Sequence, residues 1–212
     1  MKNHRDEVSH STTSPVNTSP PASGSTQPGT PGRGSTSILT VNAPKKKQPY
    51  PVVAATAIFA KGTSGVAFSP DGRTLATGSA DRTVRLWDTT AGGTPHVLKR
   101  HTAPVTSVAF SRDGRHLATG GTDSTVLIWD VDTRRARTEL STDTDSVTFS
   151  PDGRTLATGG TSYLGDYAVK LWDVSTGATV SSLSGHSDHV LGTAFAPDGR
   201  TLASAGRDHT VR

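Results

Sequence analysis

The sequence of 212 residues contains no cysteine and one methionine, and aromatic side chains make up only 5% of it. The absence of cysteine excludes disulfides and thiolate metal sites. Long apolar runs are also lacking. The longest uncharged stretch of this kind, residues 48–60, contains Pro49 and Pro51 and is shorter than the roughly 20 residues that a membrane span needs. The N-terminus lacks the apolar segment of a secretory signal, so we expect no membrane span and a cytoplasmic protein.

Hydrophobic residues are scarce as well, at 32% of the chain, and they are unevenly distributed. Residues 1–50 hold 8 Ser, 7 Thr, 7 Pro and 4 Gly, whereas residues 51–212 hold nearly all the aromatic side chains and most of the valines and leucines. A polar, proline-rich composition cannot bury enough apolar surface to fold alone. We therefore predict a disordered tail or linker at residues 1–49 and a folded segment at residues 50–212.

The formal net charge of +4 comes entirely from the first 50 residues, which contain six basic and two acidic side chains. The rest of the chain carries 16 of each sign. A domain that binds nucleic acid is expected to carry excess positive charge on its folded surface. We therefore expect no nucleic-acid partner.

What the folded segment does contain is an internal repeat. The segment Val66–Gly78, with the sequence VAFSPDGRTLATG, returns in closely similar form from Val108, Val147 and Thr193. The first three copies are followed by the blocks TVRLWD, TVLIWD and AVKLWD, and their tryptophans are spaced by 42 and 43 residues. Alternating apolar residues around a Pro-Asp-Gly turn predict antiparallel strands. A weaker outer strand is expected at residues 95–99, 136–140 and 178–183.

Recurrence of this block in register resembles the WD-repeat β-propeller family, in a bacterial type rich in Ser-Pro-Asp-Gly repeats. The resemblance implies an all-β partial propeller, with complete four-stranded blades at residues 62–99, 102–140 and 143–183 and part of a fourth at 187–212. Residues 51–58 are expected to form the closing outer strand. Because the family usually closes with about seven blades, we expect a fragment, with self-association through the unfinished blade as the alternative.

The resemblance also implies a buried hydrogen-bonded network in each blade. Its members are an Asp six residues before the Trp, a Ser or Thr on the second strand, and a His 22 residues before the Asp. The positions that match are Thr77, Asp81 and Trp87; His101, Thr119, Asp123 and Trp129; Thr158, Asp166 and Trp172; and His186, Ser204 and Asp208. The His position falls on Phe59 in the first blade and on Leu140 in the third, so we expect incomplete networks there.

These polar residues recur once per blade, whereas an active site occurs once. We therefore expect a structural network and no enzyme, cofactor or metal site. The His186–His189 segment has the composition of a metal cluster, but His186 already belongs to the network. Extra residues at 161–165 lengthen one loop, and Tyr163, Leu164, Tyr167 and Arg207 are the candidate partner-binding residues. Packing of Leu164 and a Tyr ring on the neighbouring blade is an equally weighted alternative.

Three functions remain open from the sequence. The leading one is a non-catalytic scaffold that presents propeller loops to protein or peptide partners. The alternative is a sensor or regulatory propeller module of a Ser/Thr protein kinase or another effector. A propeller enzyme is disfavoured, because it would need a polar cluster that does not repeat.

Overall fold

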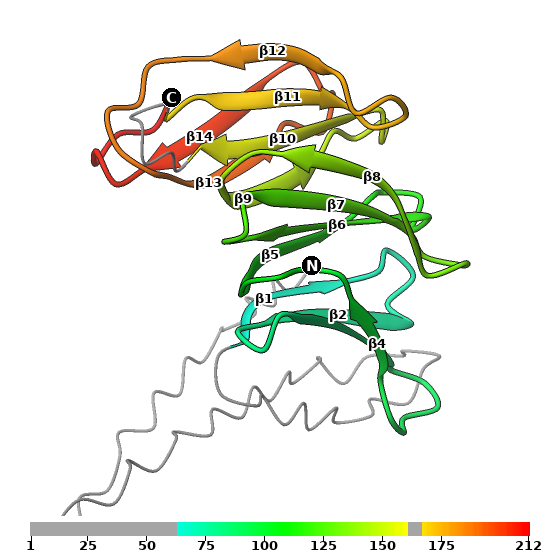
Figure 1. The fold of residues 1–212 in the computed structure, drawn as a ribbon. Coiled ribbons are helices and arrows are strands. Elements are labelled where there is room, and N and C mark those ends of the chain that lie inside the picture. Colours follow the sequence, from blue (N-terminus) through cyan, green and yellow to red (C-terminus); the bar gives the residue numbers. More distant parts are fainter. Residues whose placement is uncertain (1–62, 161–166) are drawn as a thin grey trace, which may run out of the picture. The chain divides into compact units, whose positions relative to one another are not determined.

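The computed structural model describes residues 63–160 and 167–212, and this part of the chain consists of strands and turns without a helix. Three four-stranded sheets and one two-stranded sheet are formed (Figure 1). Blade 1 contains β1 (Thr63–Phe68), β2 (Thr74–Ser79), β3 (Thr83–Asp88) and β4 (His96–Lys99). Blade 2 contains β5 (Val105–Phe110), β6 (His116–Gly121), β7 (Thr125–Asp130) and β8 (Arg135–Ser141). Blade 3 contains β9 (Thr144–Phe149), β10 (Thr155–Gly160), β11 (Val169–Asp173) and β12 (Thr179–Leu183), and blade 4 contains β13 (Val190–Phe195) and β14 (Leu202–Gly206).

Each blade is an antiparallel meander in which strands adjacent in sequence pair with each other. The register repeats as well: Leu75, Leu117 and Leu156 lie opposite the tryptophans of β3, β7 and β11. In blade 4 an isolated bridge between Ala205 and Val211 continues the pattern beyond β14. The predicted all-β fold of partial propeller blades is confirmed. Two predicted segments, the tail at 1–49 and the closing strand at 51–58, lie outside the described residues.

The turn between the first two strands of a blade is closed by side chains as well as by backbone. In blade 1 the Ser69 hydroxyl donates to Asp71 at 2.6 Å, and the same carboxylate accepts the Arg73 N–H at 3.0 Å. Gly72 takes a φ of 69°, a left-handed conformation that glycine adopts without a Cβ penalty. The same bonds recur in blades 2 and 3, which explains why Ser, Asp and Gly return at fixed positions.

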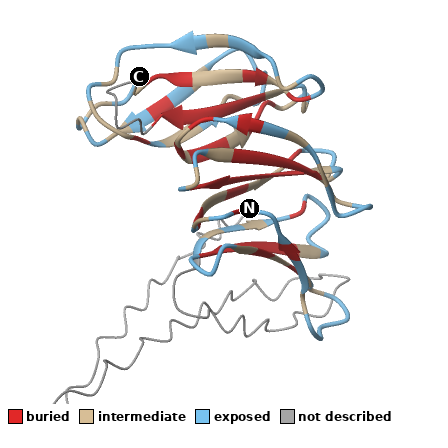
Figure 2. Cartoon of the chain, in the orientation of Figure 1, coloured by how far each residue is buried: buried red, intermediate tan, exposed pale blue. Residues whose placement is uncertain are grey.

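The apolar core lies between the blades, because each sheet covers its neighbour. One cluster joins blades 1 and 2 and a second joins blades 2 and 3, while a smaller one joins blades 3 and 4. Figure 2 shows that buried residues are concentrated on the second strand of blades 1 to 3 (β2, β6 and β10), whereas the turns are mostly exposed. Polar bonds cross the same boundaries: the Val147 N–H donates to the Ser107 hydroxyl, and the Thr193 N–H donates to the Ser146 hydroxyl, both at 3.1 Å.

Glycines on the second strand permit this close approach. A Cβ added to Gly78 would lie 2.7 Å from Val105 Cγ1, and one added to Gly120 would lie 2.7 Å from Thr144 Cγ2. At Gly159 the nearest atom is the backbone oxygen of Val190, at 2.6 Å. Contacts this short force a neighbour to move, and a backbone carbonyl moves less readily than a side chain. The repeated Gly is therefore a packing requirement of the next blade.

The Gly159→Ala substitution is expected to lower the free energy of unfolding by about 1–3 kcal/mol, the range for overpacking a close contact. Gly192→Ala in β13 is the matched control, because a Cβ there meets no atom within 4 Å. Urea denaturation of both variants measures the difference. Equal stability of the two variants would show that the contact between blades 3 and 4 tolerates a methyl group.

Candidate functional site

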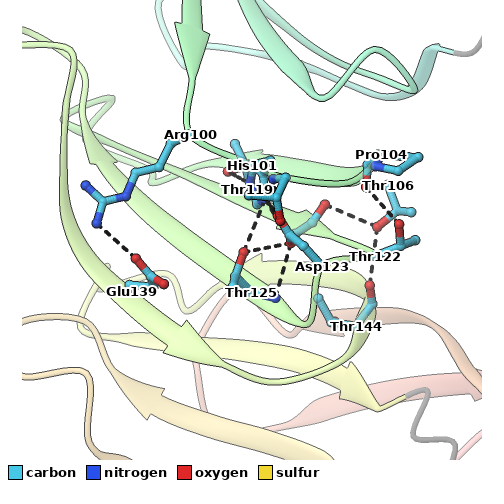
Figure 3. Close-up of polar contacts among 12 residues, drawn as sticks. Arg100, His101, Pro104, Thr106, Thr119, Thr122, Asp123, Thr125, Glu139 and Thr144 are labelled. Carbon is cyan, nitrogen blue, oxygen red and sulfur yellow. Dashed lines mark hydrogen bonds and ion pairs between the residues drawn. The ribbon is translucent and has the colours of Figure 1, made fainter.

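The polar residues of blade 2 come together at one end of its sheet. His101 lies between β4 and β5, Thr119 lies on β6, Asp123 lies in the β6–β7 turn, and Trp129 lies on β7. Figure 3 shows His101, Thr119 and Asp123 converging on one another. The His101 side chain is 1% exposed and that of Asp123 is 6% exposed, so these polar groups depend on each other for hydrogen bonds.

The bonds form a chain through the sheet. His101 Nδ1 lies 3.0 Å from Asp123 Oδ2, and His101 Nε2 lies 2.8 Å from the Thr119 hydroxyl. The same hydroxyl accepts the Trp129 indole N–H at 2.9 Å. In a neutral imidazole the carboxylate requires the proton on Nδ1. The Thr119 hydroxyl then donates to Nε2, and every group in the chain has a partner.

Two further donors hold the Asp123 carboxylate in its ionised form. The Thr125 hydroxyl donates to it at 2.7 Å, and so does the Thr102 N–H at 2.7 Å. Burial alone would raise the pKa of Asp123, but these hydrogen bonds and His101 together lower it to about 2. The ionised carboxylate thus connects the β6–β7 turn, where Asp123 lies, to Thr102 in the segment that leads into β5.

Blade 4 repeats the arrangement. His186 Nδ1 lies 2.8 Å from Asp208 Oδ2, and His186 Nε2 lies 2.9 Å from the Ser204 hydroxyl. The Thr210 hydroxyl donates to Asp208 at 2.8 Å. Burial acts to raise the pKa of Asp208, but the hydrogen bonds from Thr210, His186 and Ser187 outweigh it and hold the pKa well below its ordinary value. The 22-residue spacing thus brings His and Asp together in both blades.

Blade 1 uses a different partner for its aspartate. The Arg85 guanidinium and the Thr83 hydroxyl both donate to Asp81, whose side chain is 40% exposed. Trp87 still donates to the Thr77 hydroxyl, at 3.1 Å. Sequence reasoning missed Arg85, although its place four residues after Asp81 on an adjoining strand was an available signal.

Blade 3 keeps only part of the set among the described residues. Trp172 donates to the Thr158 hydroxyl at 3.0 Å, and Leu140 occupies the His position, 2% exposed. The predicted Asp166 lies outside the described residues. The Trp–Thr bond is therefore common to all three four-stranded blades, whereas the His–Asp pair is found in blades 2 and 4.

The polar groups buried within the described blades are paired. In the described residues every buried side-chain nitrogen or oxygen has a hydrogen-bond partner, and no three His, Cys, Asp or Glu side chains group as metal ligands. No helix among these residues is long and apolar enough to cross a membrane. The expected cytoplasmic location and the absence of a nucleic-acid partner stay predictions.

A cluster that does not repeat lies where blades 3 and 4 meet. We call it the loop-end cluster, and its members are Asp145, Tyr167, His189 and Arg207. The His189 ring stacks at a tilt on Tyr167 with centroids 5.8 Å apart, and its Nδ1 lies 3.3 Å from Asp145 Oδ2. The Arg207 N–H donates to the His189 carbonyl at 2.8 Å.

The loop-end cluster joins two of the candidate partner-binding residues, Tyr167 and Arg207, through His189. The other two candidates, Tyr163 and Leu164, lie outside the described residues. Sequence reasoning missed His189 and Asp145 as members of the cluster. His189 lies just before β13 and Asp145 lies on β9, so the two are far apart in the sequence. Only the packing of blade 4 on blade 3 brings them together.

Substitution of Thr119 by Val is expected to destabilise the protein more than the same change at Thr77. Thr119→Val leaves two buried nitrogens, Trp129 Nε1 and His101 Nε2, without a partner, and each costs about 1–3 kcal/mol. Thr77→Val removes only the bond to Trp87. Chemical denaturation gives both values. A loss of stability at Thr77 as large as that at Thr119 would contradict a chain of bonds through His101.

Protonation of Asp123 is expected to destabilise the fold as pH falls from about 4 to about 2. An unfolded carboxyl has a pKa of about 3.9, and the folded pKa is about 2, so the unfolded state binds protons first. The stabilisation of the fold by ionised Asp123 is present above the unfolded pKa of about 4, and it is lost as the pH falls through the folded pKa of about 2. Asp123→Asn should make the decline of Tm with pH shallower than in wild type. Parallel curves for wild type and Asp123→Asn would contradict the assignment.

Comparison with known proteins agrees with this geometry. The family described as WD40, "WD domain, G-beta repeat", matches residues 59–88, 92–130, 141–173 and 177–212. A relative in Dictyostelium discoideum, "Periodic tryptophan protein 2 homolog", is 35% identical over 128 residues, which are 59% of this chain and 14% of that protein. This relative does not bear out the bacterial type expected from the sequence. The four matches cover more than half of the chain, and the chain belongs to the WD40 repeat family.

Proposed function

We propose that this chain is a non-catalytic scaffold that presents the ends of its propeller blades to protein or peptide partners. The observation that carries the proposal is the saturation of its polar networks. His101, Asp123 and Thr119 satisfy one another inside blade 2, and His186, Asp208 and Ser204 do the same in blade 4. Groups bound in this way shape the sheet ends and have no free atom for a substrate.

The loop-end cluster is the proposed contact surface. The His189 and Asp145 side chains are 33% and 30% exposed, and Arg207 is exposed. Tyrosine and arginine often dominate binding energy at protein interfaces, because each combines a large contact area with hydrogen bonding. Among the described residues, the contacts of His189 with Tyr167 and Asp145 depart from the repeat. The backbone bond between Arg207 and His189 recurs in blade 2, between Thr122 and Pro104. Tyr163 and Leu164 are proposed to extend the same surface.

Partner capture by the full chain tests the proposal. The chain is immobilised, and bound proteins are compared for wild type, Tyr167→Ala and Arg207→Ala, with Arg200→Ala in the β13–β14 turn as the control. Partners should bind wild type and the control equally, and the two loop-end variants about tenfold less, as for the loss of a residue worth about 1.4 kcal/mol. Equal capture by all four proteins, or loss only in the control, would place the contact elsewhere.

A further inference from the structure

The turns of blade 2 depart from those of the other blades in their arginine content. We call this surface the arginine turns: the β5–β6 turn and the β7–β8 turn with the start of β8. The two turns lie side by side, because the Val131 N–H donates to the Arg115 carbonyl at 2.9 Å. Both lie at the right of blade 2 in Figure 1. Together they carry Arg112, Arg115, Arg134, Arg135 and Arg137, all of them exposed.

Arg134 stands where the fold favours glycine. Its φ is 59°, and its N–H donates to the Asp130 carbonyl at 2.8 Å. The equivalent residues of blades 1 and 3 are Gly92 and Gly177, which have φ values of 68° and 73° and make the same bond. A side chain in this region is strained, whereas glycine is not. Arg82, Ser124 and His209 also have positive φ values, in the turn after the second strand of blades 1, 2 and 4. In the turn after the third strand, however, blade 2 alone among the described four-stranded blades holds a side chain in this conformation.

Arg112 is a second departure of the same kind. It takes the place of a proline that the other three blades have at this position, as Pro70, Pro151 and Pro197. A proline in a compatible turn stabilises the fold by restricting the unfolded chain. At two positions, blade 2 therefore replaces the residue that favours the turn with an arginine.

The positive charge of the arginine turns is not neutralised by salt bridges. None of the five guanidinium groups forms one with a residue that the structure describes. The nearby Asp113 accepts from Ser111 and the Arg115 N–H, and Asp130 accepts from the Thr133 N–H and hydroxyl. Asp132 is the third carboxylate in or next to these turns. The surface therefore carries five guanidinium groups and three carboxylates.

The position of β8 favours an extended partner. It is the outermost strand of its sheet, and such an edge has backbone groups free to pair with an added strand. Arg135, Arg137 and Glu139 alternate on its exposed side, and Glu139 is already paired with Arg100 at 2.9 Å. Arg137 lies 3.4 Å from His116 Nε2. The turns carry no aromatic side chain on which a nucleic-acid base could stack.

We propose that the arginine turns bind an acidic segment of a partner protein, extended along the edge of blade 2. This inference rests on the proposed scaffold function and adds a second surface of defined chemistry to it. Guanidinium groups recognise carboxylates through paired hydrogen bonds. On this proposal, Arg134 and Arg112 are present because they add two guanidinium groups that contact the acidic segment. The strained backbone at Arg134 and the missing proline at Arg112 follow from that choice of residue.

Binding of a fluorescently labelled glutamate-rich peptide to the full chain tests the inference by fluorescence anisotropy. A glutamine-rich peptide of equal length is the matched probe, and a labelled single-stranded RNA is the competing one. Arg134→Gly is expected to weaken peptide binding roughly two- to fivefold, as for one exposed charge contact, and the Arg134→Gly/Arg112→Pro double variant about tenfold. Both should have an unchanged or higher Tm, because each restores the residue of the other blades, so lost binding cannot be attributed to unfolding.

Arg154→Gln removes one charge from the equivalent turn of blade 3 and should leave binding unchanged. Equal binding of the glutamate-rich peptide by wild type and the double variant would overturn the inference. Binding of RNA but not of the peptide would overturn it in favour of a nucleic-acid surface. Loss of the peptide only in Tyr167→Ala or Arg207→Ala would assign the acidic segment to the loop-end cluster, which overturns this inference and leaves the scaffold function standing.

Discussion

Each blade buries its apolar face against the next one, and this close approach is the constraint on which the rest of the structure depends. Two residues at equivalent positions show its effect: Val66 on β1 is 49% exposed, whereas Val108 on β5 is 8% exposed because blade 1 covers it. A Val moved from exposed to buried contributes about 1.5–3 kcal/mol, and the gain requires sheets near enough to touch. The second-strand glycines provide that approach. In blade 4 the same position is Ala205, which is exposed.

The polar networks follow from this packing. Between tightly stacked sheets, a buried indole or imidazole nitrogen cannot reach water and must find a partner inside the blade. The Thr119 hydroxyl bonds to both Trp129 and His101, and the Asp123 carboxylate ties the β6–β7 turn to the segment that leads into β5. In the two blades that lack the His, the residue that takes its place differs with burial. The half-exposed Asp81 takes the charged Arg85, while the deeply buried Leu140 removes the polar group altogether.

Sequence reasoning predicted the features that repeat and missed those that depend on contact between repeats. The strands and the Gly turn were predicted from the repeat itself. The His101–Asp123 and His186–Asp208 pairs were predicted from the resemblance to the WD-repeat family, whose spacing these residues match. Arg85 was missed because the sequence predicted only an incomplete network in blade 1, where the His position falls on Phe59, and a salt bridge to Asp81 was not considered. His189 and Asp145 were missed because they meet only when β13 packs on β9. The strain at Arg134 became visible only from its φ in the structure, since an arginine in a turn gives no sign of a left-handed backbone.

The departures from the repeat therefore carry most of the functional information. A residue that recurs in every blade is explained by folding, and its presence says little about partners. The loop-end cluster and the arginine turns both break the pattern, at opposite ends of the sheets, because antiparallel strands place the β5–β6 and β7–β8 turns at one end and the β10–β11 connection at the other. The two surfaces differ in chemistry: one combines a tyrosine with a paired His and Asp, and the other carries more arginines than carboxylates. The two proposed surfaces share no residue, so partners of different character would not compete for the same side chains.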